Sequence, residues 1–540
     1  MIFVNLLNFI DYPFIFFKEK FRKLYLNSNI YNRKITPSNN SSLDYRPSPI
    51  LLDCLIKYGK KKINIKNYFI SKVWDNHELS KKDHKNLHSF FWLFSLDLKS
   101  SKKDTQNIIL QWIEKNYQYN SKSWEVDIVS KRIIAWLSSS KLTYEDSDDD
   151  YKKKFNNIIK KQINHLINEI RASESVDDKM IGCSAVILVG LSYKNEIEFL
   201  NVGLNLLKKL VKLSFDNDGF PKSRNIRQLN FYLKYFILIR EWLKESQSEI
   251  PEFIDENIYY LGQAYAFTSK NNKCNFLFNG NQENNNVHFD GYLKKFGYNF
   301  KNQSNELGGY AVLGNKKICL VMDVGPTPDK RFSFNYQAGS LSFEIISGGR
   351  KLICNSGYFQ NFKHRLNEIS KSSATHSTLV LDDSSSCKFT KKKQIFESLK
   401  ITKKNIVFEE NYWKINAAHD GYLKQYGVIH NREIEFYPEQ MKFVGYDKII
   451  SKNNIKNLKF EIRFHLEPNV KVMKTLNGQT ILIDLDGEAW KFNSNLNNID
   501  IDNGLYFGKK NSFVNNKNIF ISGMTNDDNQ TIKWEITQLK

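Results

Sequence analysis

Apolar positions follow a helical spacing over much of the first half of the chain. In 105–117 (TQNIILQWIEKNY) and 127–137 (DIVSKRIIAWL) apolar residues recur three or four positions apart, which places them on one face of a helix. The same spacing predicts helices over 86–98, 151–172, 183–191, 201–213 and 230–245. Short polar connections between these segments imply that neighbouring helices are antiparallel.

The pattern changes after residue 270 to short alternating segments separated by glycine, asparagine and aspartate. In 340–346 (SLSFEII) small or polar residues alternate with apolar ones, and Gly348-Gly349 then supplies a hairpin turn before 351–354. Alternation predicts further strands over 317–324, 378–381, 406–409, 433–437, 460–465, 479–484, 490–492 and 519–522. We therefore expect an antiparallel β-sandwich in this half.

These two patterns and a length of 540 residues favour two domains and a small third piece. We expect an apolar N-terminal helix and linker over 1–46, a helical domain over 47–270 and a β-domain over 271–540. The stretch 35–49 is rich in serine, asparagine and proline, as linkers are. No apolar run reaches the length that spans a membrane.

Residues 1–23 are apolar and aromatic and end in a basic cluster. Asp11 and Pro13 interrupt the apolar run, and no small-residue cleavage site follows, so the segment lacks the pattern of a cleaved secretory signal. We expect a helix that docks on the body of the protein or lies on a membrane surface, with peripheral membrane contact through residues 1–25.

The formal net charge of +21 suits an anionic partner. A bias toward lysine, asparagine and isoleucine, with the charge spread over solvated faces, is the alternative, and the sequence leaves both open. The chain has no zinc-ligand spacing, no helix-turn-helix pattern and no dense basic tract interleaved with aromatics, so we expect no nucleic-acid partner. Its six cysteines are widely spread, mostly in apolar runs, and we expect buried thiols.

The stretch from Asn335 to Cys387 combines a strand, a Gly-Gly turn, a second strand, a polar loop and a third strand. Its pieces AGSLSFEIISGG, LICNSG and THSTLVLDD resemble the C-terminal β-domain of the heparinase II/III family of polysaccharide lyases. The later segments 419–432 (HDGYLKQYGVIHNR) and 444–448 (VGYDK) are similar to further strands of that domain. The likeness is greatest to members with an AGxLSFE stretch, and it implies an α/α toroid followed by an antiparallel β-sandwich.

Lyases of this family cleave uronate-containing polysaccharides by β-elimination. One group neutralises the uronate carboxylate, a base removes the neighbouring proton, and an acid protonates the leaving oxygen. The resemblance therefore implies an acidic polysaccharide or oligosaccharide as partner. A non-catalytic protein that binds acidic glycans and a surface-associated scaffold are the alternatives. The family suggests the cell envelope or periplasm, whereas the missing signal pattern suggests the cytoplasm.

The chain departs from the family where better-characterised members carry a His-x-His-x-Asp pattern. Those places hold Asn335, Gln337 and Gly339, and the metal-ligating Asp of the second strand corresponds to Asn355. Only His376 keeps the type of its counterpart. One histidine among neutral amides is a poor ligand set for zinc, so we expect no metal and no cofactor.

The resemblance and the residue types together give the candidate site. The candidate acid and base groups are His376, His419, His430 and Tyr232, and the candidate substrate contacts are Arg224, Asn225, Asn335, Gln337, Asn355, Arg365 and Arg432. Arginine binds a carboxylate in a bidentate fork, which favours it over lysine. For each histidine, a hydrogen-bonded structural role stays open.

The segment 216–235 predicts a helix that Ser223 caps, with Arg224, Asn225 and Arg227 in its first turns. Cations at a helix start oppose the helix dipole, so a bound carboxylate would explain them, and solvated arginines are the alternative. Aromatic-rich groups further upstream favour core or groove-wall positions: His88, Phe91, Trp92, Trp124, Arg132 and Trp136.

Overall fold

A computed structural model describes residues 20–38, 42–52, 74, 79–96, 102–193, 196–269, 275–283, 286–315, 317–451, 457–509, 512–525 and 529–539. The chain forms two compact units. The first, which we call the helical unit, comprises Met1–Leu213 and Lys234–Glu256; the second, the β unit, comprises Ser214–Leu233 and Asn257–Lys540. The domain limits expected at residues 46 and 270 stay predictions.

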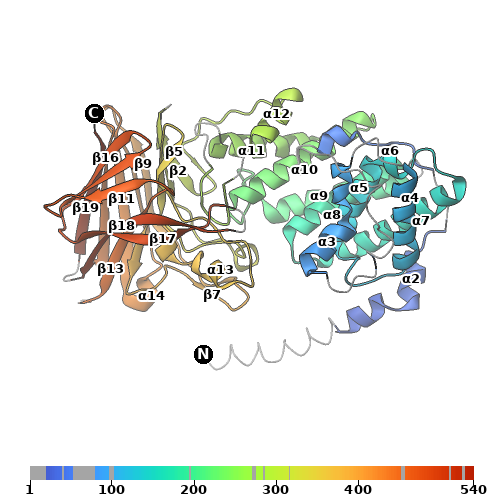
Figure 1. Ribbon diagram of the computed structural model, residues 1–540, viewed down its shortest axis with the longest axis horizontal. Helices are drawn as coiled ribbons and strands as arrows, with labels where there is room; N and C mark the ends of the chain where they lie inside the picture. Colours follow the sequence, from blue (N-terminus) through green and yellow to red (C-terminus); the bar gives the residue numbers. More distant parts are fainter. Residues whose placement is uncertain are drawn as a thin grey trace. The chain divides into compact units, whose positions relative to one another are not determined.

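Antiparallel helices build the helical unit (Figure 1). They are α2 (Asn29–Ile35), α3 (Lys81–Ser89), α4 (Lys102–Asn116), α5 (Val126–Ser138), α6 (Ser140–Thr143), α7 (Asp149–Glu169), α8 (Val176–Ser192) and α9 (Ile197–Ser214), with 3-10 turns at Pro49–Leu52, Phe91–Ser95 and Ile170–Ala172. The boundary between the units falls within α10 (Ile226–Glu245) and α11 (Glu252–Ser269). Helix α5 packs against α3, α7 and α8.

The core of this unit includes part of the aromatic-rich group. Arg132 is fully buried, donates to Gln162 and to the carbonyls of His88 and Ser123, and lies 4.0 Å from the ring centre of Trp112. Trp124 and Trp136 are also buried. The expectation of core positions is confirmed for these three residues. The hydrogen bonds of Arg132 connect α5 to neighbouring segments.

Most helices expected from the apolar spacing are confirmed, but the helix expected over 86–98 is wrong. Helix α3 begins earlier, at Lys81, and ends at Ser89 because Phe90 adopts a left-handed backbone with a φ of 57°. The next five residues form a 3-10 turn. Phe90 is buried, with its ring centre 5.1 Å from that of Trp136, so tertiary packing ends the helix.

The β unit consists of sheets of antiparallel strands. A five-stranded sheet runs in sequence order: β1 (Glu306–Leu307), β2 (Tyr310–Gly314), β3 (Ile318–Asp323), β4 (Phe343–Ser347) and β5 (Arg350–Ile353). A four-stranded sheet has the order β17 (Ile499–Tyr506), β18 (Val514–Met524), β13 (Lys459–His465) and β6 (Leu379–Leu381). The short strands β7 (Lys388–Phe389) and β8 (Ile395–Glu397) pair with each other.

The largest sheet has eight strands. Their order is β14 (Lys471–Lys474), β15 (Thr480–Leu485), β16 (Glu488–Ser494), β19 (Asn529–Gln538), β12 (Lys442–Ser451), β11 (Val428–Tyr437), β10 (Trp413–His419) and β9 (Ile401–Phe408). Three short α-helices complete the unit: α12 (Val287–Lys295), α13 (Arg365–Ile369) and α14 (Leu423–Tyr426).

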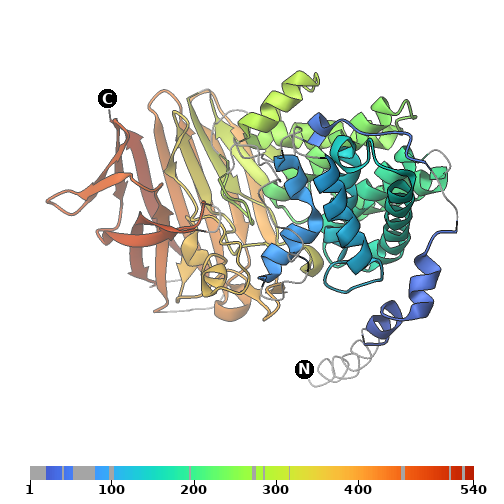
Figure 2. The ribbon, with the colours of Figure 1, turned by 45° about the vertical axis from the view of Figure 1, so that its right-hand side comes forward.

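Figure 2 shows the strands of the β unit gathered together. One apolar core joins its three larger sheets. Phe343 of the five-stranded sheet stacks on Trp534 of the eight-stranded sheet, with ring centres 5.2 Å apart. Phe464 of the four-stranded sheet meets the same indole edge-on at 5.0 Å. The expected antiparallel sandwich is thus confirmed.

One expectation in this half is wrong in detail. Residues 287–295 form α12 although we expected only strands after residue 270. Within the segment 419–432, β10 ends at His419, α14 follows, and β11 begins at Val428. Asp420 makes the turn, since its carbonyl accepts from the backbone N–H of Leu423.

Four cysteines lie in the part of the chain that the structure describes: Cys183, Cys319, Cys354 and Cys387. All four are buried free thiols, as expected. Cys54 and Cys274 lie outside the described residues, as do residues 1–19 of the expected N-terminal helix. Over the described ranges, no helix is both long and apolar enough to cross a membrane.

We expect Gly445→Ala to destabilise the β unit. Gly445 lies opposite Trp534 across the β12–β19 pair, and an added Cβ would lie 2.0 Å from Cζ2 of that indole. Trp534 is fully buried and its Nε1 donates to Asp447, so a shift of the indole would disturb core packing and this hydrogen bond. The free energy of unfolding should fall by about 2 kcal/mol.

Urea denaturation of the full chain measures this effect. Gly291→Ala is the matched control, because Gly291 lies in α12 and a Cβ added there would meet no heavy atom within 4 Å. The control should be neutral or slightly more stable than the wild type. Equal stabilities of the two variants would contradict the packing argument.

Candidate functional site

Polar loops at one end of the β unit bring several of the candidate residues together. Asn335 and Gln337 precede β4, Asn355 follows β5, and His376 precedes β6. Backbone hydrogen bonds join these loops: Ser356 N–H donates to the carbonyl of Thr375, and Ala338 N–H to that of Lys371. We call these residues and the loops that carry them the loop cluster.

Gln337 holds the loop cluster together. Its Oε1 accepts from Gly280 N–H at 3.0 Å, and its Nε2 donates to the carbonyls of Gly357 at 3.0 Å and Ser370 at 2.6 Å. The side chain is fully buried. Its amide is therefore engaged by protein groups, which gives this candidate substrate contact a structural part in the loops.

Asn355 and His376 are both buried and each has one polar atom without a partner in the described structure. Asn355 Oδ1 accepts from Ser377 N–H at 3.0 Å, while its Nδ2 has none. Nδ1 of His376 lies 2.8 Å from the carbonyl oxygen of Ser372, which can only accept, so Nδ1 carries the hydrogen. Nε2 then keeps a lone pair with no partner.

The surroundings of His376 keep its imidazole neutral. Burial lowers the pKa of His376 to about 4, against the hydrogen bond to Ser372, which acts to raise it. The ring lies against Gly339, where an added Cβ would be 2.5 Å from Cδ2. Glycine at that position therefore makes room for a neutral imidazole with the geometry of a base.

A second group within the loop cluster forms around Tyr358, which sequence reasoning missed. The Tyr358 hydroxyl donates to Oδ1 of the half-buried Asn335 at 3.2 Å. Burial raises the pKa of Tyr358, whereas Asn367 and the charge of Arg227 act in the opposite direction. The only sequence signal was its place just after the strand in LICNSGYF.

Asn225 belongs to the same group. A Cβ at Gly280 would lie 2.7 Å from Asn225 Nδ2 and 2.7 Å from Asn335 Cβ, so the two asparagines flank that glycine. Asn225 Nδ2 has no partner among the described residues. The structure thus brings Asn225 and Asn335 together with Tyr358.

Arg224 holds the fold of the β unit instead of presenting a free guanidinium. Its Nη2 lies 2.6 Å from Asp323 Oδ1, and its other donors reach backbone carbonyls of Gly308, Gly309, Gly325 and Pro326. Every guanidinium nitrogen has a protein acceptor. We therefore assign this arginine to structure instead of to a carboxylate clamp.

The helix start expected at Ser223 is also wrong. Helix α10 begins at Ile226, and Arg224 precedes it in a left-handed conformation with a φ of 58°. Asn225 Oδ1 accepts from Gln228 N–H at 3.2 Å, so Asn225 makes the cap. Because Arg224 lies outside the helix, the helix dipole gives no reason to expect a carboxylate bound to it.

His430 and Arg432 lie in the core around Asp447, not at a surface. Nε2 of His430 lies 2.7 Å from Asp447 Oδ1, and Arg432 reaches both carboxylate oxygens, at 2.7 and 3.0 Å. All three side chains are fully buried. Burial alone would raise the pKa of Asp447, but Arg432 and His430 hold it well below its usual range.

The remaining candidates lie elsewhere in the β unit. His419 is buried at the end of β10, where its Nδ1 accepts from Gly421 N–H at 3.0 Å, and burial depresses its pKa. Tyr232 is buried in α10 with its ring edge-on to Phe215. Arg365 is exposed at the first residue of α13. For His419 and Arg365 the structure describes no contact with the Tyr358 group.

The residues of the loop cluster do not fit a metal ion. Gln337 is fully engaged by protein groups, and Asn335 and Asn355 offer neutral amides beside the one imidazole of His376. Neutral amides are weak ligands for zinc. Across the described ranges, no group of three or more His, Cys, Asp or Glu side chains is arranged to hold a metal.

Comparisons with known proteins match this architecture. The model of the heparinase II/III-like C-terminal domain matches residues 302–535. The fold is similar to that of the heparan sulfate lyase HepC from Pedobacter heparinus, with a TM-score of 0.65 at 13% identity over 92% of this chain and 86% of that chain. It is also similar to heparinase III, with a TM-score of 0.66 at 14% identity over 95% and 88%. No curated protein sequence matches the chain.

These likenesses confirm the expected fold class, an α/α toroid followed by an antiparallel β-sandwich. At such low identity, the solved structures show only that the fold is similar. The expected similarity to AGxLSFE members stays a prediction. The match over residues 302–535 agrees with the strands, loops and core of the β unit. Residues 302–535 therefore form a heparinase II/III-like C-terminal domain.

Proposed function

We propose that the protein is a polysaccharide lyase that cleaves an acidic, uronate-containing glycan by β-elimination in the loop cluster of the β unit. The observation that carries this proposal is the hydrogen bond between the Tyr358 hydroxyl and Asn335, with the charge of Arg227 acting on the same tyrosine. The fold, shared with a heparan sulfate lyase and with heparinase III, supports the same reaction class.

The reaction needs a group that stabilises the carboxylate, a base and an acid, and the loop cluster and the adjacent start of α10 together offer a group for each. Amide donors from Asn225 and Asn335, with the positive charge of Arg227, would stabilise the uronate carboxylate as negative charge builds up. The unpartnered Nε2 of His376 would accept the proton beside that carboxylate. Tyr358, which burial keeps in its neutral form, would protonate the leaving oxygen.

Two exposed aromatic rings beside Tyr358 would hold the sugar. Phe334 and Phe362 are 41% and 39% exposed, and their ring centres lie 4.6 Å apart. The Phe362 ring centre lies 6.5 Å from that of Tyr358. Flat apolar faces next to polar donors suit a pyranose ring, which is apolar on its faces and polar at its edge.

Binding without catalysis is the second candidate. The burial of His376, which is 1% exposed, and the engagement of Gln337 by protein groups favour it, because both groups face protein atoms. The partner would again be an acidic glycan, and the positive net charge suits it. For either candidate we propose the cell envelope or periplasm as the location, with membrane contact through residues 1–25.

We expect the full chain, incubated with a panel of acidic polysaccharides, to generate the ultraviolet absorbance of unsaturated uronates. Tyr358→Phe removes only the hydroxyl, so it should lower kcat by at least about a hundredfold while glycan binding persists. His376→Ala should abolish turnover. Tyr412→Phe and His288→Ala are the matched controls, since both residues lie outside the loop cluster, and they should retain wild-type rates.

Each result of this assay has a defined meaning. Turnover that survives in both Tyr358→Phe and His376→Ala would refute the assignment of the loop cluster. His419→Ala tests the structural reading of that histidine, because it should lower stability with kcat maintained in the folded fraction. No turnover on any substrate, with binding retained, would favour the second candidate.

The pH profile of turnover gives an independent prediction. A general base must be neutral, and the pKa of His376 is about 4. We therefore expect kcat/KM to stay level from pH 7 to about pH 5 and to fall only near pH 4. A fall already centred near 6.5, the ordinary value for histidine, with the fold intact would be incompatible with His376 as the base.

Stability must be followed in the same experiment by circular dichroism. Because the folded-state pKa of His376 is depressed, the unfolded chain binds a proton below about pH 6.5 that the folded chain does not. Its contribution to stability is therefore present above pH 6.5, declines as the pH falls toward 4, and stays constant at lower pH. The folded fraction corrects the rates for this loss.

A further inference from the structure

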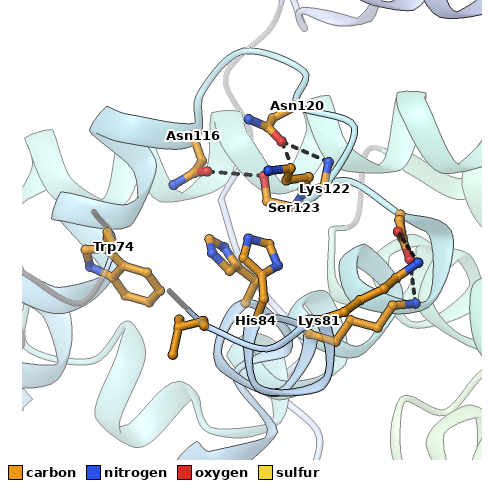
Figure 3. Close-up of a pocket in the computed structure, with 11 residues that line it drawn as sticks. Trp74, Lys81, His84, Asn116, Asn120, Lys122 and Ser123 are labelled. Carbon is orange, nitrogen blue, oxygen red and sulfur yellow. Dashed lines mark hydrogen bonds and ion pairs between the residues drawn. The ribbon is translucent and has the colours of Figure 1, made fainter. Parts of the chain in front are cut away.

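A cavity of about 540 Å³ in the helical unit has no part in the chemistry above (Figure 3). It lies between α3 and the connection from α4 to α5, and it is lined by Trp74, Leu79, Lys81, His84, Lys85, His88, Asn116, Asn120, Lys122, Ser123 and Glu125. Its volume is within the range of small-ligand sites. Its lining is polar, basic and aromatic, which points to a specific class of ligand.

One wall of the cavity consists of three flat rings, of which two are stacked and the third, Trp74, is tilted by 59° from His88. The imidazoles of His84 and His88 are one helical turn apart in α3, with ring centres 4.1 Å apart and planes at 27°. The ring centre of Trp74 lies 5.5 Å from that of His88. Such a wall offers a face on which a sugar ring can stack, with ring nitrogens at its edge.

The hydrogen-bonding state of His88 is fixed by its neighbour. Trp112 Nε1 can only donate, and it lies 3.0 Å from His88 Nδ1, so Nδ1 accepts and Nε2 carries the hydrogen. Burial, His84 and Arg132 lower the pKa of His88 to about 3, which keeps the ring neutral. His88 therefore lines the cavity with an N–H donor for which the structure describes no protein acceptor.

The opposite wall supplies more donors. Figure 3 shows Asn116, Asn120, Lys122 and Ser123 across from His84. Asn120 Oδ1 accepts from the backbone N–H groups of Lys122 and Ser123, which fixes the loop, and the structure describes no acceptor for the amide NH₂ of this exposed side chain. The side-chain donors of Asn116 and Ser123 are already bound to protein oxygens. Donors on both walls favour a ligand rich in acceptor oxygens.

The charge of the lining favours an anion. Among the lining residues, Lys81, Lys85 and Lys122 are cations and Glu125 is an anion, which forms ion pairs with Lys85 and, at 3.8 Å, with Lys81. Lys85 also pairs with Asp127, at 3.3 Å. For Lys122 the structure describes no ion pair, and its charge contributes to the lowered pKa of His84. The cavity therefore carries excess positive charge next to a stacking surface.

We infer that this cavity is a second saccharide-binding site, which takes a sugar unit bearing a carboxylate. The ring would stack on Trp74 and the two imidazoles, His88 Nε2 and Asn120 would bind its hydroxyl oxygens, and Lys122 would pair with the carboxylate. This inference rests on the proposed function for its ligand class, an acidic glycan, and it concerns residues of the helical unit alone. A polysaccharide bound in the cavity would have a raised effective concentration of its remaining sugar units at the protein.

The test uses the full chain in the Tyr358→Phe background, so that lyase activity cannot consume the probe. Titration calorimetry compares a glucuronate tetrasaccharide with cellotetraose, its neutral glucose counterpart. The double variant His84→Ala/Lys122→Ala should weaken binding of the glucuronate tetrasaccharide at the cavity by about tenfold or more, which corresponds to about 1.4 kcal/mol, while binding at the loop cluster persists. Cellotetraose should bind more weakly than the acidic probe before the change.

The control double variant is His288→Ala/Lys153→Ala, which removes one exposed histidine and one exposed lysine outside the cavity. It should bind as tightly as the background chain. Equal affinities of the two double variants, equal affinities for the two probes, or no binding of the glucuronate tetrasaccharide would each overturn the inference.

The turnover assay on the otherwise wild-type chain separates this inference from the proposed function. Absent turnover with cavity-dependent binding would refute the lyase proposal and sustain the second site. Turnover that depends on Tyr358, with binding insensitive to His84→Ala/Lys122→Ala, would support the lyase proposal and refute the second site. Lys122→Arg keeps the charge and should restore most of the affinity, which distinguishes charge recognition from a loss of fold.

Discussion

The arrangement of the β unit depends on one buried carboxylate. Asp447 accepts hydrogen bonds from Arg432, His430 and the indole of Trp534, so all of its charge is compensated inside the core. Arg432 in turn donates to the carbonyls of Leu341, at 2.9 Å, and Ser377, at 2.7 Å. An uncompensated charge in this position would cost several kcal/mol, on the order of 3 to 5, so each member requires the others.

This network reaches the candidate site through the backbone. Leu341 follows the loop that carries Asn335 and Gln337, and Ser377 follows His376. The hydrogen bonds of Arg432 to these two carbonyls therefore anchor both loops. Arg224 holds the start of the first of these loops, through Asp323 and the carbonyl of Gly325. Two arginines that the sequence suggests as ligand clamps therefore position the loops instead of binding the ligand. Rigid loops of this kind can hold small polar groups in a fixed geometry.

The sequence predicts the fold class and most elements because apolar spacing is a local property. Helices α4, α5 and α7 lie close to their expected ranges for this reason. The helix expected over 86–98 fails at Phe90, whose left-handed backbone reflects packing against Trp136, a contact that no local pattern encodes. Helix α12 was missed because it follows a stretch rich in asparagine and is short.

The candidate site was less predictable. A residue type indicates what a side chain can do, but burial and partners decide whether it does so, and those depend on tertiary contacts. His376, His419 and His430 are alike in the sequence, yet only Nε2 of His376 combines a lone pair with a place in the loop cluster. Tyr358 gave no signal beyond its position, since its hydrogen bond to Asn335 joins residues on separate loops.

The central claim is that an acidic sugar meets the chain at Tyr358 and Asn335 while the Asp447 network stays intact. The most direct measurement is a crystal structure of the Tyr358→Phe chain soaked with a glucuronate tetrasaccharide. We expect a uronate carboxylate beside Asn335 and Arg227, a sugar ring against Phe334 or Phe362, and unchanged bonds between Arg432 and Asp447. A sugar bound to Arg432, His419 or His430 with that network opened, or none at the loop cluster, would contradict it.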